Sequence, residues 1–184
     1  MRFMKGRAMS KRYEELIVRI PNYPKAGVIF QDIMPVIGDA EAFAEVVDAI
    51  ADHFADKGIT KVMGAEARGF VVGAAVAYRL GAGFIPARKP GKLPRGTISE
   101  TYDLEYGSNT LEVHADAVAP DDVVLIADDL IATGGTAVAM CKLVERFGAT
   151  LAGLGFFIEL AEFDPRAILA EVTDAEVYSL VVVE

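Results

Sequence analysis

Two adjacent carboxylates stand directly before a turn rich in glycine and threonine. The apolar segment 123–127 is typical of a buried strand, and the segment 137–147 is typical of a helix. The turn between them reads Asp128, Asp129, Leu130, Ile131, Ala132, Thr133, Gly134, Gly135 and Thr136. In open α/β sheets ligands bind where a strand ends and a helix begins, because unpaired N–H groups and the helix dipole attract anions there. The turn therefore predicts a phosphate site.

The residue types in this turn suit different parts of a sugar phosphate. The hydroxyls of Thr133 and Thr136 can donate to a phosphate, and Gly134 and Gly135 let the backbone close around it without Cβ clashes. Two carboxylates would repel a phosphate, so we expect them to face a sugar diol or a hydrated Mg²⁺ beside it. A strand end with solvated acids would explain either half of the pattern. Both halves together indicate a ribose phosphate.

Residues 128–136 resemble the phosphoribosyl pyrophosphate (PRPP) signature of the type I phosphoribosyltransferases. Three more segments resemble motifs of the adenine phosphoribosyltransferase family, in that family's order: 64–70 (GAEARGF), 88–94 (RKPGKLP) and 102–107 (YDLEYG). The likeness covers residues 13–157. It implies an α/β protein with the type I phosphoribosyltransferase fold, a twisted and mainly parallel sheet flanked by helices. A small N-terminal hood is expected at about 21–35 and a flexible lid hairpin at about 91–109.

The resemblance also implies a role for each motif. Arg68 is expected to be catalytic and to bind pyrophosphate, and Glu105 in the lid is expected to exchange a proton with the purine or to stabilise positive charge. The pyrophosphate group is Arg68, Arg88, Lys89 and Lys92. The PRPP- and AMP-binding group is Asp128, Asp129, Ala132, Thr133, Gly134, Gly135 and Thr136. The adenine-binding group is Ile29, Phe30 and Gln31. Mg²⁺ is expected as cofactor, held mainly by PRPP, and no protein side chain is assigned to it.

The predicted base-binding segment departs from the family at two positions. Gln31 stands where the family usually has arginine, and Ala26 where it usually has proline. Recognition of adenine by backbone groups would tolerate Gln31, since every residue except proline carries the same N–H and C=O. Recognition by the arginine side chain would change the base preference.

Three functions are therefore weighed. The first is transfer of the phosphoribosyl group from PRPP to adenine, which gives AMP and pyrophosphate in purine salvage. The second is the same transfer to hypoxanthine, guanine or xanthine. The third is a PRPP-sensing regulator without catalysis, which is disfavoured because the chain offers no basic recognition helix for DNA.

Composition limits the remaining possibilities. A chain of 184 residues with 53% hydrophobic content predicts one core, and its net charge of −9 disfavours a nucleic-acid partner. The run from Arg88 to Arg95 is basic; a solvated loop is one interpretation, and a pyrophosphate clamp the other. Cys141 is the only cysteine, so we expect no disulfide within the chain, a cytoplasmic location and a packing role for its thiol. No apolar run predicts a membrane span.

The order of elements predicts a single domain over 13–184 after a disordered extension at 1–12. The family resemblance further implies a homodimer in which Arg88 reaches the pyrophosphate site of the neighbouring subunit. Apolar periodicity alternates between strands and helices, which favours a parallel sheet with helices on both faces. The expected strands are 60–65, 84–87, 123–127, 151–160 and 177–183, and the expected helices are 43–54, 69–80, 135–147 and 165–171.

Overall fold

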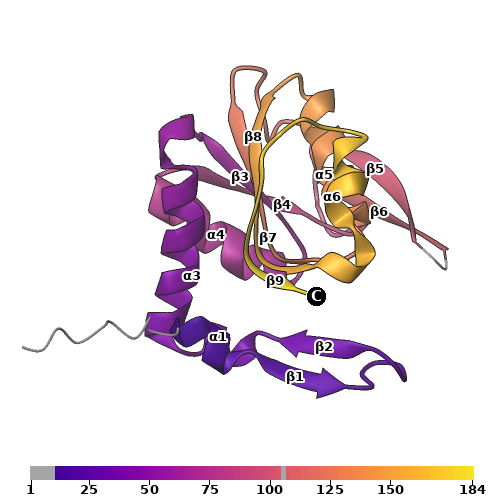
Figure 1. Ribbon diagram of the computed structural model, residues 1–184. Coiled ribbons are helices and arrows are strands. Elements are labelled where there is room, and N and C mark those ends of the chain that lie inside the picture. The colour runs from indigo at the N-terminus through magenta and orange to yellow at the C-terminus, as the bar shows by residue number, and fades with distance from the viewer. Residues whose placement is uncertain (1–10, 105–106) are drawn as a thin grey trace, which may run out of the picture. The chain divides into compact units, whose positions relative to one another are not determined.

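The computed structural model describes residues 11–104 and 107–184, and its chain divides near residue 46 into two compact units (Figure 1). The smaller unit contains an antiparallel pair of strands between short helices. Its elements are α1 (Arg12–Leu16), β1 (Val18–Pro21), β2 (Ile29–Asp32), α2 (Met34–Ile37) and the first half of α3 (Ala40–His53). Arg12 forms ion pairs with Asp39 and Glu41 within this unit. The hairpin overlaps the segment expected to form the hood, whose extent stays a prediction.

The larger unit, 47–184, is built on a five-stranded sheet in the order β4–β3–β7–β8–β9. Every neighbouring pair in this sheet is parallel. The strands are β3 (Lys61–Ala65), β4 (Gly83–Ala87), β7 (Val123–Ile131), β8 (Thr150–Leu160) and β9 (Val177–Val183). The connecting helices are α4 (Arg68–Leu80), α5 (Gly135–Arg146) and α6 (Pro165–Ala170), with 3₁₀ turns η1 (Ala55–Lys57) and η2 (Ala161–Phe163).

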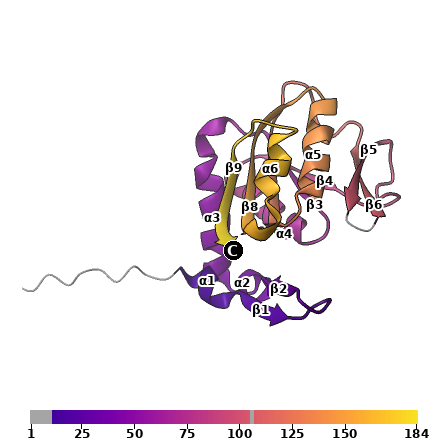
Figure 2. The same cartoon turned by 45° about the vertical axis from the view of Figure 1, so that its right-hand side comes forward.

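Helices cover both faces of this sheet. Figure 2 shows α5 and α6 on one side, whereas α4 and the end of α3 lie on the other. Side chains alternate accordingly: Ile126 and Phe156 join the core cluster beneath α5, and Ile50 and Phe54 pack against glycines of β8 from the α3 side. The expected type I phosphoribosyltransferase architecture is confirmed. No helix in the described part of the chain is long and apolar enough to cross a membrane.

Strand β7 is longer than its apolar run predicted. We expected the strand to end at residue 127, but it continues to Ile131 because β8 pairs with it as far as the Ile131–Glu159 position. Asp128 and Asp129 consequently lie inside the strand, and each is only 6% exposed. The view of these carboxylates as solvated side chains after a strand end is therefore wrong. They are buried titratable groups, so their surroundings shift their pKa values.

A two-stranded antiparallel hairpin, β5 (Thr97–Leu104) and β6 (Gly107–His114), overlaps the segment expected to form the lid and extends beyond it, and the role of that segment stays a prediction. Its pairing runs from Thr97–His114 to Leu104–Gly107. The base of the hairpin is held on α5: Glu100 pairs with Lys142 at 3.5 Å, and Arg146 donates to the Ser99 carbonyl. Residues 105 and 106, at the tip, lie outside the described residues.

Cys141 lies on α5 inside the main core cluster, as expected of a packing residue. Burial raises the pKa of its thiol to about 12, so the thiol stays protonated at neutral pH. It is therefore a small apolar side chain of the core rather than a nucleophile.

Gly153 of β8 tests the packing of α3 on the sheet. A Cβ at this position would overlap Cε1 of the buried Phe54 ring and lie 3.1 Å from the carbonyl oxygen of Glu176. We expect Gly153→Ala to lower the free energy of unfolding by about 1–3 kcal/mol, measured by urea denaturation, since overpacked cores must shift the backbone. Gly83→Ala is the control, because its Cβ would meet only the flexible side chain of Lys61. Equal stability of the two variants would contradict this packing.

Candidate active site

A polar cradle lies where β7 ends and α5 begins. Its cavity of about 180 Å³ is lined by Asp128, Leu130, Ile131, Ala132, Thr133, Gly134, Gly135, Thr136, Ala137 and Phe156. Gly134 precedes the helix with φ of +82°, a conformation that side chains with a Cβ rarely adopt. The first N–H groups of the twelve-residue helix α5 have no carbonyl partner within the helix. The cradle therefore suits an anion, as its sequence predicted.

A second cavity of about 270 Å³ adjoins the cradle, since Asp128, Leu130 and Thr136 line both. Its other walls come from β3, the β3–α4 turn, the first residue of α4 and β7: Ala65, Glu66, Ala67, Arg68 and Asp129. The Glu66–Ala67 peptide bond in this turn is cis. The two cavities together give room for a ligand with an anionic group at one end and a polar body beside the carboxylates.

The two aspartates are held differently at the boundary of these cavities. Asp129 Oδ2 lies 2.9 Å from Nε of Arg68, and Asp128 Oδ1 accepts a hydrogen bond from the Asp129 N–H at 2.8 Å. Burial, and then the negative charge of Asp129, raise the pKa of Asp128 well above its usual value. Burial also raises the pKa of Asp129, although Arg68 opposes the shift. A hydroxyl donor or a cation beside these carboxylates would relieve the repulsion between them.

Gly69, the second residue of α4, lets the helix approach Asp128 closely. A Cβ at Gly69 would overlap Oδ1 of Asp128 and lie 2.7 Å from its Cγ. The sequence motif contained this glycine, but nothing in the spacing of residues 64–70 showed that it faces a carboxylate near residue 128. Gly69 is therefore a residue of the site that sequence reasoning missed.

Arg88 continues the cationic wall at the end of β4. Its Nε lies 2.9 Å from Oε2 of Glu66, and its guanidinium carbon lies 5.9 Å from the centre of the Phe70 ring. Lys89 and Lys92 follow on an exposed loop. The structure thus brings Arg68 and Arg88 to neighbouring strand ends, and it adds Glu66 as a partner that the sequence did not reveal.

The residues predicted to bind adenine lie in the N-terminal unit. Ile29, Phe30 and Gln31 lie on β2 in the N-terminal unit, where the Phe30 ring makes an edge contact with Tyr23 at 5.3 Å between centroids. Gln31 is buried, and its Oε1 accepts no hydrogen bond from any residue that the structure describes. Glu105 lies outside the described residues. The roles expected for all four stay predictions.

Comparison with known proteins agrees with this geometry. Residues 37–173 match the family model described as phosphoribosyl transferase domain. The adenine phosphoribosyltransferase of Solidesulfovibrio magneticus is 56% identical over 146 residues, which are 79% of this chain and 85% of that protein. The enzyme of the same name from Aeromonas salmonicida is 53% identical over 82% of this chain and 83% of its own.

Solved structures agree as well. The crystal structure of adenine phosphoribosyltransferase from Thermoanaerobacter pseudethanolicus superposes with a TM-score of 0.88 at 44% identity, covering 93% of this chain and 98% of its own. The Giardia lamblia enzyme, solved with 9-deazaadenine, gives 0.86 at 34% identity and covers 94% and 96%. With the paired carboxylates, the anion cradle and the arginines in place beside this likeness, the chain belongs to the phosphoribosyltransferases, in the adenine phosphoribosyltransferase family.

Proposed function

We propose that this protein is a pentosyl-transferring glycosyltransferase that moves the 5-phosphoribosyl group of PRPP to adenine, giving AMP and pyrophosphate in purine salvage. The observation that carries the proposal is the buried pair Asp128 and Asp129, held between an anion cradle and a cavity walled by Arg68. This arrangement matches a ribose with a phosphate at each end. Relatives named for the adenine reaction support the choice of base.

Positioning of PRPP begins at the cradle. The 5′-phosphate would accept hydrogen bonds from the N-terminus of α5 and from the hydroxyls of Thr133 and Thr136, while Asp128 and Asp129 accept hydrogen bonds from the ribose hydroxyls. Fixing both parts of the sugar presents C1 to the incoming base in one orientation. Positioning of this kind lowers a barrier by up to about 7–11 kcal/mol.

The protein must also stabilise the pyrophosphate leaving group. As the bond from C1 to pyrophosphate breaks, positive charge develops on the ribose and negative charge on pyrophosphate. Arg68 lines the cavity next to the carboxylates, and Arg88, Lys89 and Lys92 extend the cationic wall from β4. Arg68 would shift from Asp129 toward pyrophosphate, so it stabilises charge that grows in the transition state.

The base and the general acid–base group complete the proposal. Ile29 and Gln31 would read the edge of adenine through their backbone groups, Phe30 would supply an apolar wall, and Glu105 would stabilise charge or exchange a proton at the purine. The buried state of Gln31 supports recognition by its backbone rather than by a side chain that reaches out from the surface.

Mg²⁺ fits this site as a companion of the substrate. Mg²⁺ prefers oxygen ligands and is often held by one or two carboxylates together with substrate phosphates. Asp128 and Asp129 offer such carboxylates, whereas no cluster of three or more potential metal ligands occurs in the described ranges. When bound, the ion would neutralise charge on the departing pyrophosphate.

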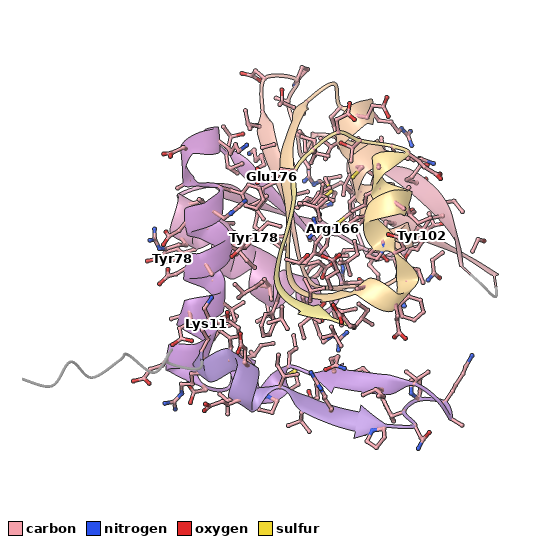
Figure 3. All side chains as sticks on the ribbon, viewed as in Figure 1. Lys11, Tyr78, Tyr102, Arg166, Glu176 and Tyr178 are labelled. Atoms are coloured by element: carbon pink, nitrogen blue, oxygen red, sulfur yellow. The ribbon has the colours of Figure 1, made fainter. Side chains whose placement is uncertain are left out.

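We also propose a cytoplasmic homodimer with one functional domain over 13–184, a hood at about 21–35 and a lid at about 91–109. An apolar stripe on α4 supports a dimer: Val71 is 41% exposed and Tyr78, two turns further on, is 89% exposed. Figure 3 labels Tyr78 on this part of the chain. Arg88 is the residue proposed to reach the pyrophosphate site of the neighbouring subunit.

The test is a turnover assay with PRPP and Mg²⁺, in which adenine, hypoxanthine, guanine and xanthine are offered separately. We expect AMP and pyrophosphate from adenine, with kcat/KM at least about 100-fold above that for the other purines, because buried polar groups reject bases that leave them unpaired. Preferred turnover of another purine would show that the protein is specific for that base, and it would indicate that the side chain of Gln31 takes part in base recognition. Binding of PRPP without turnover of any base would overturn the catalytic proposal.

A further inference from the structure

Tyr102 connects the hairpin to the anion cradle. Its side chain comes from β5 (labelled in Figure 3), and its hydroxyl oxygen lies 3.1 Å from Oγ1 of Thr136, the second residue of α5. Thr136 lines both cavities of the site. Tyr102 itself lines neither of them in the described part of the site. Its contact with the site is therefore the hydrogen bond to the hydroxyl of Thr136.

The ring of Tyr102 is fixed by packing. Together with Ile98, it is half-buried against the core cluster beneath α5. The same stretch of β5 is tied to α5 through the pairing of Glu100 with Lys142 and through the bond from Arg146 to the Ser99 carbonyl. The contacts between β5 and α5 thus hold the phenol of Tyr102 next to Thr136, at the end of α5 that begins at the cradle.

A threonine hydroxyl has one proton to donate and two lone pairs to accept with. In the structure Thr136 donates to the Tyr102 oxygen. A phosphate in the cradle offers only acceptors, so Thr136 must turn its proton toward the phosphate. The Tyr102 O–H can then donate into the vacated side of Thr136 Oγ1. In such a chain each hydrogen bond polarises the next and strengthens it.

We propose that Tyr102 is a positioning residue, which orients the hydroxyl of Thr136 toward the 5′-phosphate of the substrate. This inference rests on the proposed function only in that a ribose 5-phosphate group occupies the cradle.

The first test is Tyr102→Phe, which removes the hydroxyl and keeps the packed ring. We expect KM for PRPP to rise about 5- to 10-fold, with kcat and KM for adenine changed less than about twofold. The reason is that the hydrogen bond from the Thr136 hydroxyl to the 5′-phosphate is weakened when Tyr102 no longer orients it. Tyr178→Phe is the matched control: Tyr178 lies on the edge strand β9 and stacks on His53 at 3.9 Å. Equal effects of the two variants would overturn the inference.

The second test is a double-mutant cycle. In a Thr136→Val background Tyr102→Phe should have no further effect on KM for PRPP, since the hydroxyl that Tyr102 orients is gone. In a Thr136→Ser background, which keeps a hydroxyl, the 5- to 10-fold effect should return. Losses that simply multiply in the Thr136→Val background would show that Tyr102 acts on the fold or elsewhere in the site, and the inference would be wrong.

A binding measurement separates this inference from the proposed function. The dissociation constant of ribose 5-phosphate, measured by calorimetry without turnover, should rise about 5- to 10-fold in Tyr102→Phe. Such a rise in a protein that makes no AMP would sustain the inference and overturn the function. An unchanged constant in a protein that makes AMP would do the reverse. Failure of the wild-type protein to bind ribose 5-phosphate would overturn both.

Discussion

Asp128→Asn is expected to make the protein more stable and at the same time much less active. The carboxylate is buried, and burial together with the charge of Asp129 disfavours its ionised form. Asparagine keeps the acceptor for the Asp129 N–H and cannot ionise, so folding no longer works against an ionised carboxylate at this position. It also removes a charged acceptor for the ribose hydroxyls. We expect kcat/KM for PRPP to fall about 100-fold, since hydrogen bonds to charged groups contribute about 1.5–3 kcal/mol each.

The gain in stability should depend on pH in a defined direction. The pKa of Asp128 is higher in the folded protein than its value of about 4 in an unfolded chain. The wild-type protein therefore loses stability as pH rises through the folded pKa, whereas Asp128→Asn does not. Melting temperatures measured from pH 4 to pH 8 should show the largest advantage of the variant at pH 8. The advantage should shrink as pH falls and vanish below about pH 4.

Asp122→Asn is a suitable control for this comparison. Asp122 precedes β7, and hydrogen bonds from the Ala119 N–H and the Thr60 hydroxyl lower its pKa. Its contribution therefore has the opposite sign: stability present above the unfolded pKa is lost as pH falls through the folded pKa. A melting temperature of Asp128→Asn below that of wild type at pH 8 would contradict the view that burial of the Asp128 carboxyl group lowers the stability of the folded protein at that pH.

Gly69→Ala should be the most damaging single methyl group in the site. The added Cβ would overlap Oδ1 of Asp128, and neither partner can retreat easily, because Gly69 is in the first turn of α4 and Asp128 is inside β7. The carboxylate or the helix must shift. We expect the free energy of unfolding to fall by about 1–3 kcal/mol and kcat/KM for PRPP to fall about 100-fold, since small displacements of positioning groups cost large factors in rate.

Two further variants separate the steric effect from a general one. Gly96→Ala adds the same methyl group in open space and without a positive φ, so stability and kcat/KM should stay close to wild type. Gly69→Ala combined with Asp128→Ala removes the clashing carboxylate. The double variant should regain stability relative to Gly69→Ala in urea denaturation but not activity. If it regains no stability, the close approach to Asp128 is not the cause of the damage.

The sequence determined the fold class because its signals are local. Apolar strands alternate with amphipathic helices, and each element forms from residues that are neighbours in the chain. The anion cradle could also be predicted from local sequence. Its glycines and threonines lie within residues 128–136, where β7 meets α5, so residues that are close in the chain are also close in space.

Only the tertiary structure decided how the rest of the site is assembled. The pairing of β7 with β8 buries the carboxylates, the approach of α4 places Gly69 on Asp128, and the hairpin brings Tyr102 to Thr136. Each of these contacts joins residues from different elements. Sequence spacing carries no distance between such elements, because the packing of helices and strands around a common core sets it. The local sequence thus identifies which groups can do the chemistry, and the tertiary structure determines their pKa values and their orientation.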